Sequence, residues 1–589
     1  MTSQTGADYG SAFLLNDSAA SDLFTREDLT EEHRAISDTV NSFWNNEIEP
    51  QLKHLLDRKP GFARRLMRKA SEIGLMAVSI PERFGGMELD LISALVVAEG
   101  NARDASYMIW EGGHNTIGTL PIVYFGTEDQ KARYLPALAR VDLVSAYALT
   151  EPQAGSDALA VQTRAALADS GTEYVLNGQK MWISNASEAD IFTVFAKVDG
   201  EAFTAFLIDR NSTGLRVGAE ERKMGLRGSS TTALYLDNVR VPISNVLGEV
   251  GRGHVIAFNI LNLGRLKMGA SAIGAAKDVL RLSLSYAKQR QAFGCSISEF
   301  GAIRHKLAEM AVRIFATESI VWRTAGRIRK REGDVTWSDP DAARIKLEAV
   351  REFAIECSIV KVFGSEMLDY VVDEGVQIHG GYGYHEDYTV EKAYRDSRIN
   401  RIFEGTNEIN RLLVLRMLLK RASKGLLPLF DAVDDVMRDP DGYGAKGQSA
   451  DRSAHAVPIR RAKAAALLTI GLARKAFPNG LEGEQELLML IADIIIDVYA
   501  MESTLLRTAK IADRGAAGTA CHMAAVFSEE ALLRISSNAR HVIGACSHAD
   551  ESGHWVDALT RLLSSKPADL IRHRQAIARS LLEREHYVV

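Results

Sequence analysis

The spacing of hydrophobic residues changes three times along the chain, and the first stretch has the spacing of helices. From about residue 30 to 138 the apolar residues recur every three or four positions, as at Leu66, Ala70 and Ile73. This spacing places them on one face of a helix. Proline and glycine interrupt the pattern at Pro60-Gly61, Pro81 and Gly85-Gly86. We therefore expect a unit of several amphipathic helices.

The second stretch, from about residue 145 to 250, has apolar residues at every other position. β-Branched and aromatic residues are concentrated at 173–176, 191–195 and 203–208, which is typical of strands. Asn177-Gly178 stands between two such runs, and this dipeptide predicts a two-residue hairpin turn. The stretch is thus expected to form a compact β domain.

Helical spacing returns from about residue 254 to 421, and it continues near the C-terminus. Residues 439–453 separate the two helical regions, are rich in Gly, Asp and Ser, and have no periodicity. Such a composition is typical of a linker or a mobile loop. Beyond it, helices are expected at 459–476, 484–512 and 516–539.

The predicted fold is α+β and mainly α: a helical N-terminal domain, a central β domain, a helical bundle domain and an extra C-terminal helical domain. The expected boundaries are an N-terminal tail at 1–27, the N-terminal helical domain at 28–144, the β domain at 145–253, the bundle at 254–422, a linker or mobile loop at 423–460 and the C-terminal helical domain at 461–589.

Composition excludes several classes of protein. Of the 589 residues, 46% are hydrophobic and 25% are charged, which rules out a mostly disordered chain. The 70 Lys and Arg residues against 76 Asp and Glu residues give a net charge of −6, so no electrostatic case for binding nucleic acid exists. The four cysteines lie far apart without a CxxC pair, which argues against a disulfide framework or a zinc site and fits a reducing compartment.

The expected location is cytoplasmic, because neither a secretory nor an organellar leader is evident and no apolar run is long enough to span a membrane. Peripheral contact with the inner face of a membrane stays open. Basic residues flank the apolar run 464–472, which suits a surface helix on a membrane. A helix packed on the protein core is the equal alternative.

Two segments of the β domain have residues suited to a cofactor. Residues 147–157 (YALTEPQAGSD) describe a strand end followed by Pro, Gly and Ser-Asp, whose backbone N–H groups and hydroxyls can bind a phosphate or a polar ring edge. In residues 180–186 (KMWISNA), Trp182 offers a flat surface and Ser184 a hydroxyl on the same strand face. Taken singly, the two segments are better explained by an ordinary strand-to-loop turn and by a core tryptophan.

A third segment, residues 401–411 (RIFEGTNEINR), contains a candidate base. Glu404 follows Ile402 and Phe403 and precedes a helix start that Thr406 could cap. A partly desolvated carboxylate has a raised pKa and becomes a competent base near neutral pH. The alternative is a glutamate that only stabilises the N-terminus of the helix.

Together and in this order, the three segments resemble the acyl-CoA dehydrogenase family of flavoproteins. Supporting stretches are 222–227 (RKMGLR), 237–242 (DNVRVP), 289–294 (QRQAFG), 377–381 (QIHGG) and 394–396 (YRD). Segments 484–488 and 492–501 are similar to the additional C-terminal domain of the very-long-chain branch. The resemblance runs from about residue 25 to the end.

The resemblance implies FAD as the cofactor and assigns residues to it. In one subunit these are Tyr147, Leu149, Thr150, Ser156, Trp182, Ser184, Thr406 and Glu408. Residues implied to reach the FAD of the neighbouring subunit, and hence at least a homodimer, are Arg290, Phe293, Gln377, Gly380 and Gly381. Residues implied to bind the acyl-CoA substrate are Ser156, Asn262, Arg265 and Gly405. No metal is expected, and His379 is interpreted as a packed imidazole.

The implied reaction is the α,β-desaturation of acyl-CoA thioesters to trans-2-enoyl-CoA in fatty acid β-oxidation, with Glu404 as the base that removes the α-proton. Some branches of the family place the base one residue before the arginine that corresponds to Arg265. That position is Gly264 here, so Glu404 is the available base. Electrons would pass to an electron-transferring flavoprotein.

Substrate length and two other functions stay open. Gly112, Gly113 and Gly118 would leave space near the end of the acyl slot, which favours long-chain substrates. A flavin-bearing assembly or scaffold protein with the same fold is one alternative function, and an acyl-CoA oxidase is another.

Overall fold

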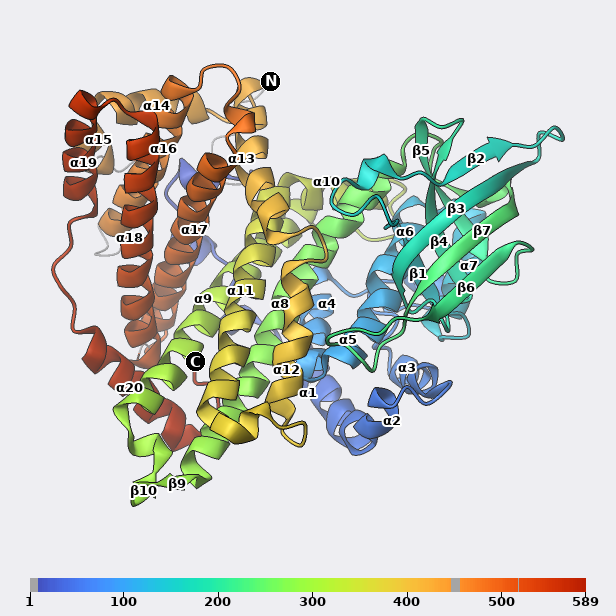
Figure 1. Ribbon diagram of the computed structural model, residues 1–589, viewed down its shortest axis with the longest axis horizontal. Coiled ribbons are helices and arrows are strands. Elements are labelled where there is room, and N and C mark those ends of the chain that lie inside the picture. The colour runs from blue at the N-terminus through green and yellow to red at the C-terminus, as the bar shows by residue number, and fades with distance from the viewer. Residues whose placement is uncertain (1–8, 446–455, 517) are drawn as a thin grey trace.

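Helices make up most of the chain, and one sheet domain lies at the end of the molecule opposite the C-terminal helices (Figure 1). The structure is a computed structural model that describes residues 9–445, 456–516 and 518–589. The helical bundle lies between the sheet domain and the C-terminal helices (Figure 1). This arrangement confirms the predicted fold class, α+β and mainly α.

The N-terminal helices lie next to the sheet domain, and some of them also pack against the bundle. They are α1 (Glu31–Phe43), α2 (Leu52–Leu56), α3 (Phe62–Glu72), α4 (Leu91–Gly100), α5 (Ala105–Gly112), α6 (Leu120–Phe125) and α7 (Glu128–Ala139), with a π-helical turn η8 (Gly113–Gly118) between α5 and α6. Asp90 caps the N-terminus of α4, and its side chain accepts a hydrogen bond from the Ser93 N–H at 2.9 Å. It is apolar almost all round and is buried, as expected for a helix with no polar face.

The sheet has eight strands. They are β1 (Ser145–Ala148), β2 (Arg164–Leu167), β3 (Glu173–Ser184), β4 (Ile191–Val198), β5 (Ala202–Asp209), β6 (Leu215–Glu220), β7 (Thr231–Pro242) and β8 (Val246–Leu247). Their order is β6-β7-β3-β2-β4-β5-β8, and β1 pairs in parallel with β4. The strands of this sheet lie between Ser145 and Leu247.

The hairpin predicted at Asn177-Gly178 is wrong. Strand β3 runs through both residues, and the chain turns between β2 and β3 at 168–172 instead. Asn177 pairs with Asn238 of β7 through its side chain, and the register of β3 and β7 shifts at Gly178. A Cβ at Gly178 would overlap Thr163, so this glycine permits a close strand approach rather than a turn.

The bundle is built around two long helices that approach each other closely. Its helices are α8 (Gly253–Gln289), α9 (Gly301–Glu332), α10 (Ala342–Glu352), α11 (Ala354–His379), α12 (Thr389–Ser397) and α13 (Asn407–Ser423). A Cβ at Gly269 of α8 would overlap Val360 of α11, and one at Gly364 would lie 3.3 Å from the Gly269 Cα. The two glycines therefore let the backbones of α8 and α11 come together.

The segment predicted as a linker, 423–460, contains helices, so that prediction is wrong for much of its length. The C-terminal helices are α14 (Leu429–Arg438), α15 (Pro440–Ala445), α16 (Ala456–Ala476), α17 (Gln485–Asp513), α18 (Gly518–Cys546), α19 (Ala549–Leu563) and α20 (Leu570–Arg584). Helix α14 buries Leu429, Val433 and Val436, which are at helical spacing. Residues 446–455, also part of the predicted linker, lie outside the described residues.

Helix α16 packs as a core helix, so the membrane-surface interpretation of its apolar run is not supported. Residues 464–473 are buried. Lys463 pairs with Glu502 at 2.5 Å, and Arg460 pairs with Asp17 at 2.9 Å. Within the described residues, no helix is long and apolar enough to cross a membrane.

The N-terminal segment, predicted as a tail, packs against the bundle and α17 where it is described. Phe13 and Leu14 are buried, and the Phe13 ring lies 4.6 Å from that of Tyr499. Glu27 pairs with Arg507 of α17 at 2.6 Å. These contacts hold residues 9–28 between the N-terminal helices and the C-terminal domain.

Candidate active site

Glu404 occupies a tight turn at the start of α13. It adopts φ 58°, and Gly405 adopts φ 81°, so two consecutive residues are left-handed. A non-glycine residue in this region is uncommon and costs free energy, which marks the turn as functionally constrained. Thr406 caps α13, because its hydroxyl accepts a hydrogen bond from the Ile409 N–H at 3.3 Å. This confirms the capping role predicted for Thr406.

The Glu404 carboxyl lies against α8. A Cβ built on Gly264 would be 3.0 Å from Glu404 Oε2, so glycine makes room for the carboxyl. Oε2 is buried and has no hydrogen-bond partner in the described part of the chain. Burial raises the pKa of Glu404 to about 7, although the positive charges of Arg265 and Lys361 oppose the rise. Glu404 therefore has the properties of a base that works near neutral pH.

Arg265 and Asn262, both on α8, support the turn that carries Glu404. Arg265 Nε donates to the Glu404 carbonyl at 3.1 Å, and Nη1 donates to Asn262 Oδ1 at 2.9 Å. Both residues are buried. Asn410 Nδ2 donates to the Gly405 carbonyl at 2.8 Å. In this structure Arg265 and Asn262, predicted to bind substrate, thus contact the backbone of the turn that carries Glu404.

Trp182 is exposed rather than packed in the core. It adopts φ 59° at a bulge in β3, between Lys180 and Ile183, and 59% of it is exposed. A bulge re-aims a side chain out of the sheet, and here it presents a flat indole at the surface. Ser184, two residues on, is half-buried and lies opposite Thr231 in the register.

A buried ion pair that the sequence did not predict supports the segment at residues 149–151. Lys180 Nζ pairs with Glu151 Oε1 at 2.6 Å and donates to the Leu149 carbonyl at 3.1 Å. The Thr150 carbonyl accepts from the Met181 N–H at 2.9 Å. These bonds fix the segment that contains Leu149 and Thr150 to β3.

Tyr147 is buried beside Phe195, with ring centroids 5.1 Å apart. Its hydroxyl is buried without a partner among the residues that the structure describes. Burial and the nearby charge of Glu404 raise the pKa of Tyr147 well above its usual value. Ser156 lies exposed in the loop after β1, and Glu408 is exposed in the first turn of α13.

The residues expected to reach a neighbouring subunit lie at the other end of the molecule. Phe293 is at the tip of the β9–β10 hairpin (Gln291–Ala292 and Cys295–Ser296), where it adopts φ 52° and is 97% exposed. This hairpin is far from the sheet domain (Figure 1). Arg290 lies over the Tyr382 ring at 5.4 Å. Gln377 is exposed at the end of α11, and the glycines that follow it, Gly380 and Gly381, would leave an added Cβ free of contacts with the described residues.

His379 is a packed imidazole, as predicted. Its ring stacks on Tyr286 with centroids 4.1 Å apart, and Nδ1 donates to the Gly375 carbonyl at 2.7 Å. No group of three or more metal-ligating side chains occurs in the ranges that the structure covers.

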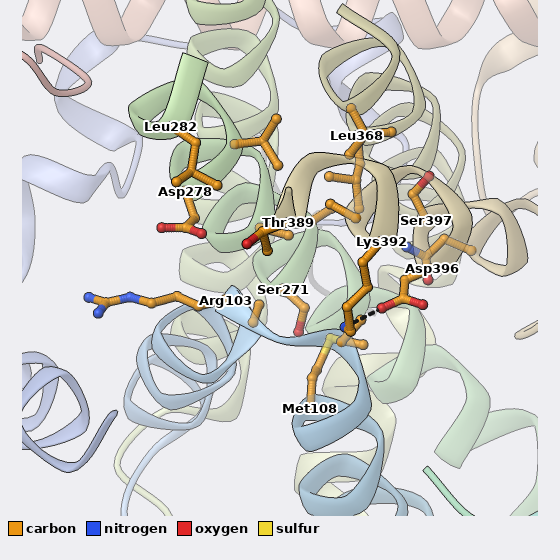
Figure 2. Close-up of a pocket in the computed structure, with 18 of the residues that line it drawn as sticks. Arg103, Met108, Ser271, Asp278, Leu282, Leu368, Thr389, Lys392, Asp396 and Ser397 are labelled. Atoms are coloured by element: carbon orange, nitrogen blue, oxygen red, sulfur yellow. Dashed lines mark hydrogen bonds and ion pairs between the residues drawn. The ribbon is translucent and has the colours of Figure 1, made fainter. Parts of the chain in front are cut away.

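A cavity lies beside α8, between it and α12 (Figure 2). Its apolar lining is Met108, Met268, Ala272, Ala275, Val279, Leu282, Leu368, Val372 and Ala393. Met268 is one helical turn after Gly264, and Asn400, which also lines the cavity, is four residues before Glu404. The α8 residues from Met268 to Leu282 form one stripe about 20 Å long. Lys392 and Asp396 pair at its polar side, at 2.6 Å.

Two of the three glycines assigned to the acyl slot have another reason to be small. A Cβ at Gly118 would overlap Ser145 and the Gly113 carbonyl, and one at Gly113 would lie 2.7 Å from Asn185 Nδ2. Their size thus lets the turn η8 pack against the sheet domain. Gly112 alone of the three would leave an added Cβ free of contacts within the described ranges. The structure does not support the interpretation of Gly113 and Gly118 as slot residues.

Family models of known proteins match about four-fifths of the chain. The acyl-CoA dehydrogenase N-terminal domain matches residues 30–142, the middle domain 146–239 and the C-terminal domain 251–419. A second model described as an acyl-CoA dehydrogenase C-terminal domain matches residues 461–561.

Individual proteins agree with these models. A probable acyl-CoA dehydrogenase of Bacillus subtilis is 44% identical over 98% of this chain and 98% of the relative. The human very long-chain specific acyl-CoA dehydrogenase is 36% identical over 75% of this chain and 70% of the relative. The structure of an acyl-CoA dehydrogenase complexed with FAD from Bacillus anthracis superposes with a TM-score of 0.96 and 42% identity, covering 99% of this chain and 100% of that one. The chain belongs to the acyl-CoA dehydrogenase family, as its sequence motifs indicate.

Proposed function

We propose that the protein is an FAD-dependent acyl-CoA dehydrogenase that desaturates acyl-CoA thioesters between Cα and Cβ, with Glu404 as the base. The observation that supports this most is the Glu404 carboxyl. It is buried with Oε2 unpartnered, and its pKa of about 7 keeps a large ionised fraction at neutral pH. A carboxylate without a partner in the described chain is available to take a proton from a bound substrate.

The residues around Glu404 prepare it for this reaction. Glu404 would remove the α-proton of the thioester, and its backbone N–H would help to polarise the thioester carbonyl. Arg265 and Asn410 hold the turn through backbone carbonyls, so the carboxyl stays free. Bound FAD would supply the acceptor for the β-hydride, because side chains provide none.

The residues present fit FAD. An exposed indole on a bulged strand can cover a planar ring, and Trp182 has this geometry. The buried, unpartnered hydroxyl of Tyr147 and the braced backbone at Leu149 and Thr150 would hold the polar edge of the ring. Ser184, Thr406 and the exposed Ser156 would complete the contacts from the same subunit.

A homodimer would complete each cofactor site. The aromatic tip at Phe293 and the open glycines after α11 lie at the end of the bundle opposite the sheet domain. These exposed groups are available to a partner surface, and a twofold dimer would bring them to the cofactor of the second subunit.

We further propose that the substrate is long-chain and that the electron acceptor is an electron-transferring flavoprotein. The apolar lining residues of α8 extend over about 20 Å of helix, and the cavity, at about 50 Å³, would have to widen to admit a long acyl chain. Very long-chain specificity is the property by which several relatives are described. The presence of a free base disfavours the alternative of a scaffold protein, which would not need one.

Product analysis tests this proposal. Purified protein, palmitoyl-CoA and an electron-transferring flavoprotein are incubated, and the thioester is analysed by mass spectrometry. A product lighter by two hydrogens that requires Glu404 is expected, so Glu404→Gln should give none. Unchanged thioester with the wild-type protein would refute the proposal. Hydrogen peroxide formed in air at the rate of desaturation would support the oxidase instead.

A further inference from the structure

A buried lysine, Lys361 on α11, is attached to the segment that carries the base. Its side chain is fully buried. Nζ donates to Asn407 Oδ1 at 2.6 Å, and Asn407 is the first residue of α13, three positions after Glu404. The helices α8 and α11 approach each other closely at Gly269 and Gly364. This approach brings Lys361 of α11 near Arg265 of α8 and near the turn that carries Glu404.

Asn407 is fixed in turn by groups that lead to the C-terminal domain. Asn407 Nδ2 donates to Glu366 Oε1 at 2.9 Å. Glu366 accepts two hydrogen bonds from Arg411, at 2.7 and 2.9 Å. Arg411 Nε also donates to Asp493 of α17 at 2.7 Å. A continuous chain of side chains therefore connects Lys361 with the extra domain.

The charges near Lys361 make its protonation sensitive to Glu404. Burial and the charge of Arg265 lower the pKa of Lys361 to about 7, while the carboxylates of Glu404, Glu366 and Glu408 oppose this. The pKa of Glu404 is also about 7, and Arg265, Lys361 and the phenol of Tyr147 are the titratable groups near it. Two interacting groups whose pKa values lie in the same range titrate as a pair.

We propose that Lys361 is a positioning residue for the reaction, which stabilises the ionised form of Glu404 by its charge and anchors the Glu404 turn to α11 through Asn407. This inference rests on the proposed function, because it assumes that the ionised carboxyl is the form that acts. Lys361 touches Asn407 rather than the reacting atoms, so its effect passes through Glu404. A purely structural lysine would stabilise the junction of α11 and α13 without changing the ionisation of Glu404.

Two variants separate charge from anchoring. Lys361→Met removes both the charge and the hydrogen-bond donor, whereas Lys361→Gln removes the charge and keeps an N–H donor that can reach Asn407. The control is Lys463→Met in the C-terminal domain. Lys463 is a buried lysine that is paired with Glu502 and has no part in the site.

The readout is the protonation of Glu404 in the FAD-loaded protein. Infrared difference spectra against pH are recorded for each protein relative to the same protein with Glu404→Gln, which isolates the Glu404 carboxyl. We expect both Lys361 variants to raise the midpoint by about one pH unit or more. The acid limb of the pH profile of kcat/KM should move to higher pH by the same amount. At a pH below both midpoints, kcat/KM of the variants should therefore be lower by about tenfold or more. Lys463→Met should move neither.

A midpoint unchanged in both Lys361 variants, with a lower unfolding temperature only, would overturn the proposal and leave Lys361 a structural residue. A shift in Lys361→Met but not in Lys361→Gln would refute the role of the charge. If the midpoint moves in both variants but Glu404→Gln still desaturates the substrate, the coupling of Lys361 to Glu404 stands and the proposed function fails.

Discussion

The buried pair of Lys180 and Glu151 allows a quantitative test of how the cofactor segment is held. Both side chains are almost completely buried, at 0% and 2% exposed, with Nζ and Oε1 2.6 Å apart. Burial lowers the pKa of Lys180 to about 8 although Glu151 opposes the change. Removing one partner of such a pair leaves an uncompensated buried charge, which costs about 3–5 kcal/mol. We expect Glu151→Leu to lower the free energy of unfolding by this amount.

The double variant Glu151→Leu with Lys180→Met provides the matched control. Replacing a buried ion pair by apolar residues of similar volume is often nearly neutral, so the double variant should recover most of the loss. Urea denaturation followed by tryptophan fluorescence measures all three proteins. FAD content after gel filtration should follow the same order, because the pair fixes the backbone at Leu149 and Thr150.

The pH dependence of Glu151→Leu gives the sign of the effect. A lysine whose pKa is depressed on folding binds more protons in the unfolded state, so stability rises as pH increases between about 8 and the unfolded value of 10.5. Without Glu151 the depression is larger, and this rise should begin at lower pH. A cost under 1 kcal/mol for Glu151→Leu, or a double variant no better than the single one, would refute the reasoning.

Four further predictions concern activity and cofactor binding. The rate at which acyl-CoA reduces the bound flavin should rise tenfold per pH unit below about pH 7 and level off above it, because ionised Glu404 is the active form. A stopped-flow pH profile without this rise would count against Glu404 as the base. Gly264→Ala should lower kcat with little change in unfolding temperature, because its Cβ would lie 3.0 Å from Oε2; equal kcat would show that the carboxyl does not rest there. Ala275→Phe should lower kcat/KM for palmitoyl-CoA roughly 5- to 150-fold and spare butyryl-CoA, and equal losses for both substrates would exclude the cavity as the acyl site. Phe293→Ala should lower FAD content without lowering the unfolding temperature of the apoprotein, since the residue is 97% exposed in one chain; unchanged FAD content would remove Phe293 from the cofactor site.

The residues of the site that are predictable from sequence are those within continuous motifs. Glu404 followed by Gly405 and a capping threonine predicts a helix start next to a desolvated carboxyl, and the structure has both. The order of helical, sheet and helical domains was predictable because the apolar residues recur every three or four positions in the first stretch, every two in the second, and every three or four again in the third.

Features that depend on distant residues were not predictable. Lys180 and Glu151 are 29 positions apart, and their pairing follows from strand register rather than from either local sequence. Asn177-Gly178 has the composition of a hairpin turn, but tertiary pairing with β7 keeps it within a strand. Gly118 is small because Ser145 lies against it, a contact that spacing alone does not reveal.

One of the helices that the sequence interpretation missed did carry a signal. In α14, Leu429, Val433 and Val436 have helical spacing. The Gly- and Asp-rich residues that follow them dominated the interpretation of the whole segment. Short helices next to such sequences are identified by their apolar spacing rather than by the composition of the surrounding residues.

Anaerobic titration of the FAD-loaded protein with palmitoyl-CoA tests the central claim most directly, by following flavin absorbance. Rapid bleaching with the wild-type protein and its loss in Glu404→Gln, at equal FAD content, is the predicted result. Bleaching at the same rate in Glu404→Gln would contradict the role of Glu404 as the base. A wild-type protein that binds FAD but is not bleached by palmitoyl-CoA or by shorter straight-chain substrates would contradict the proposed desaturation itself.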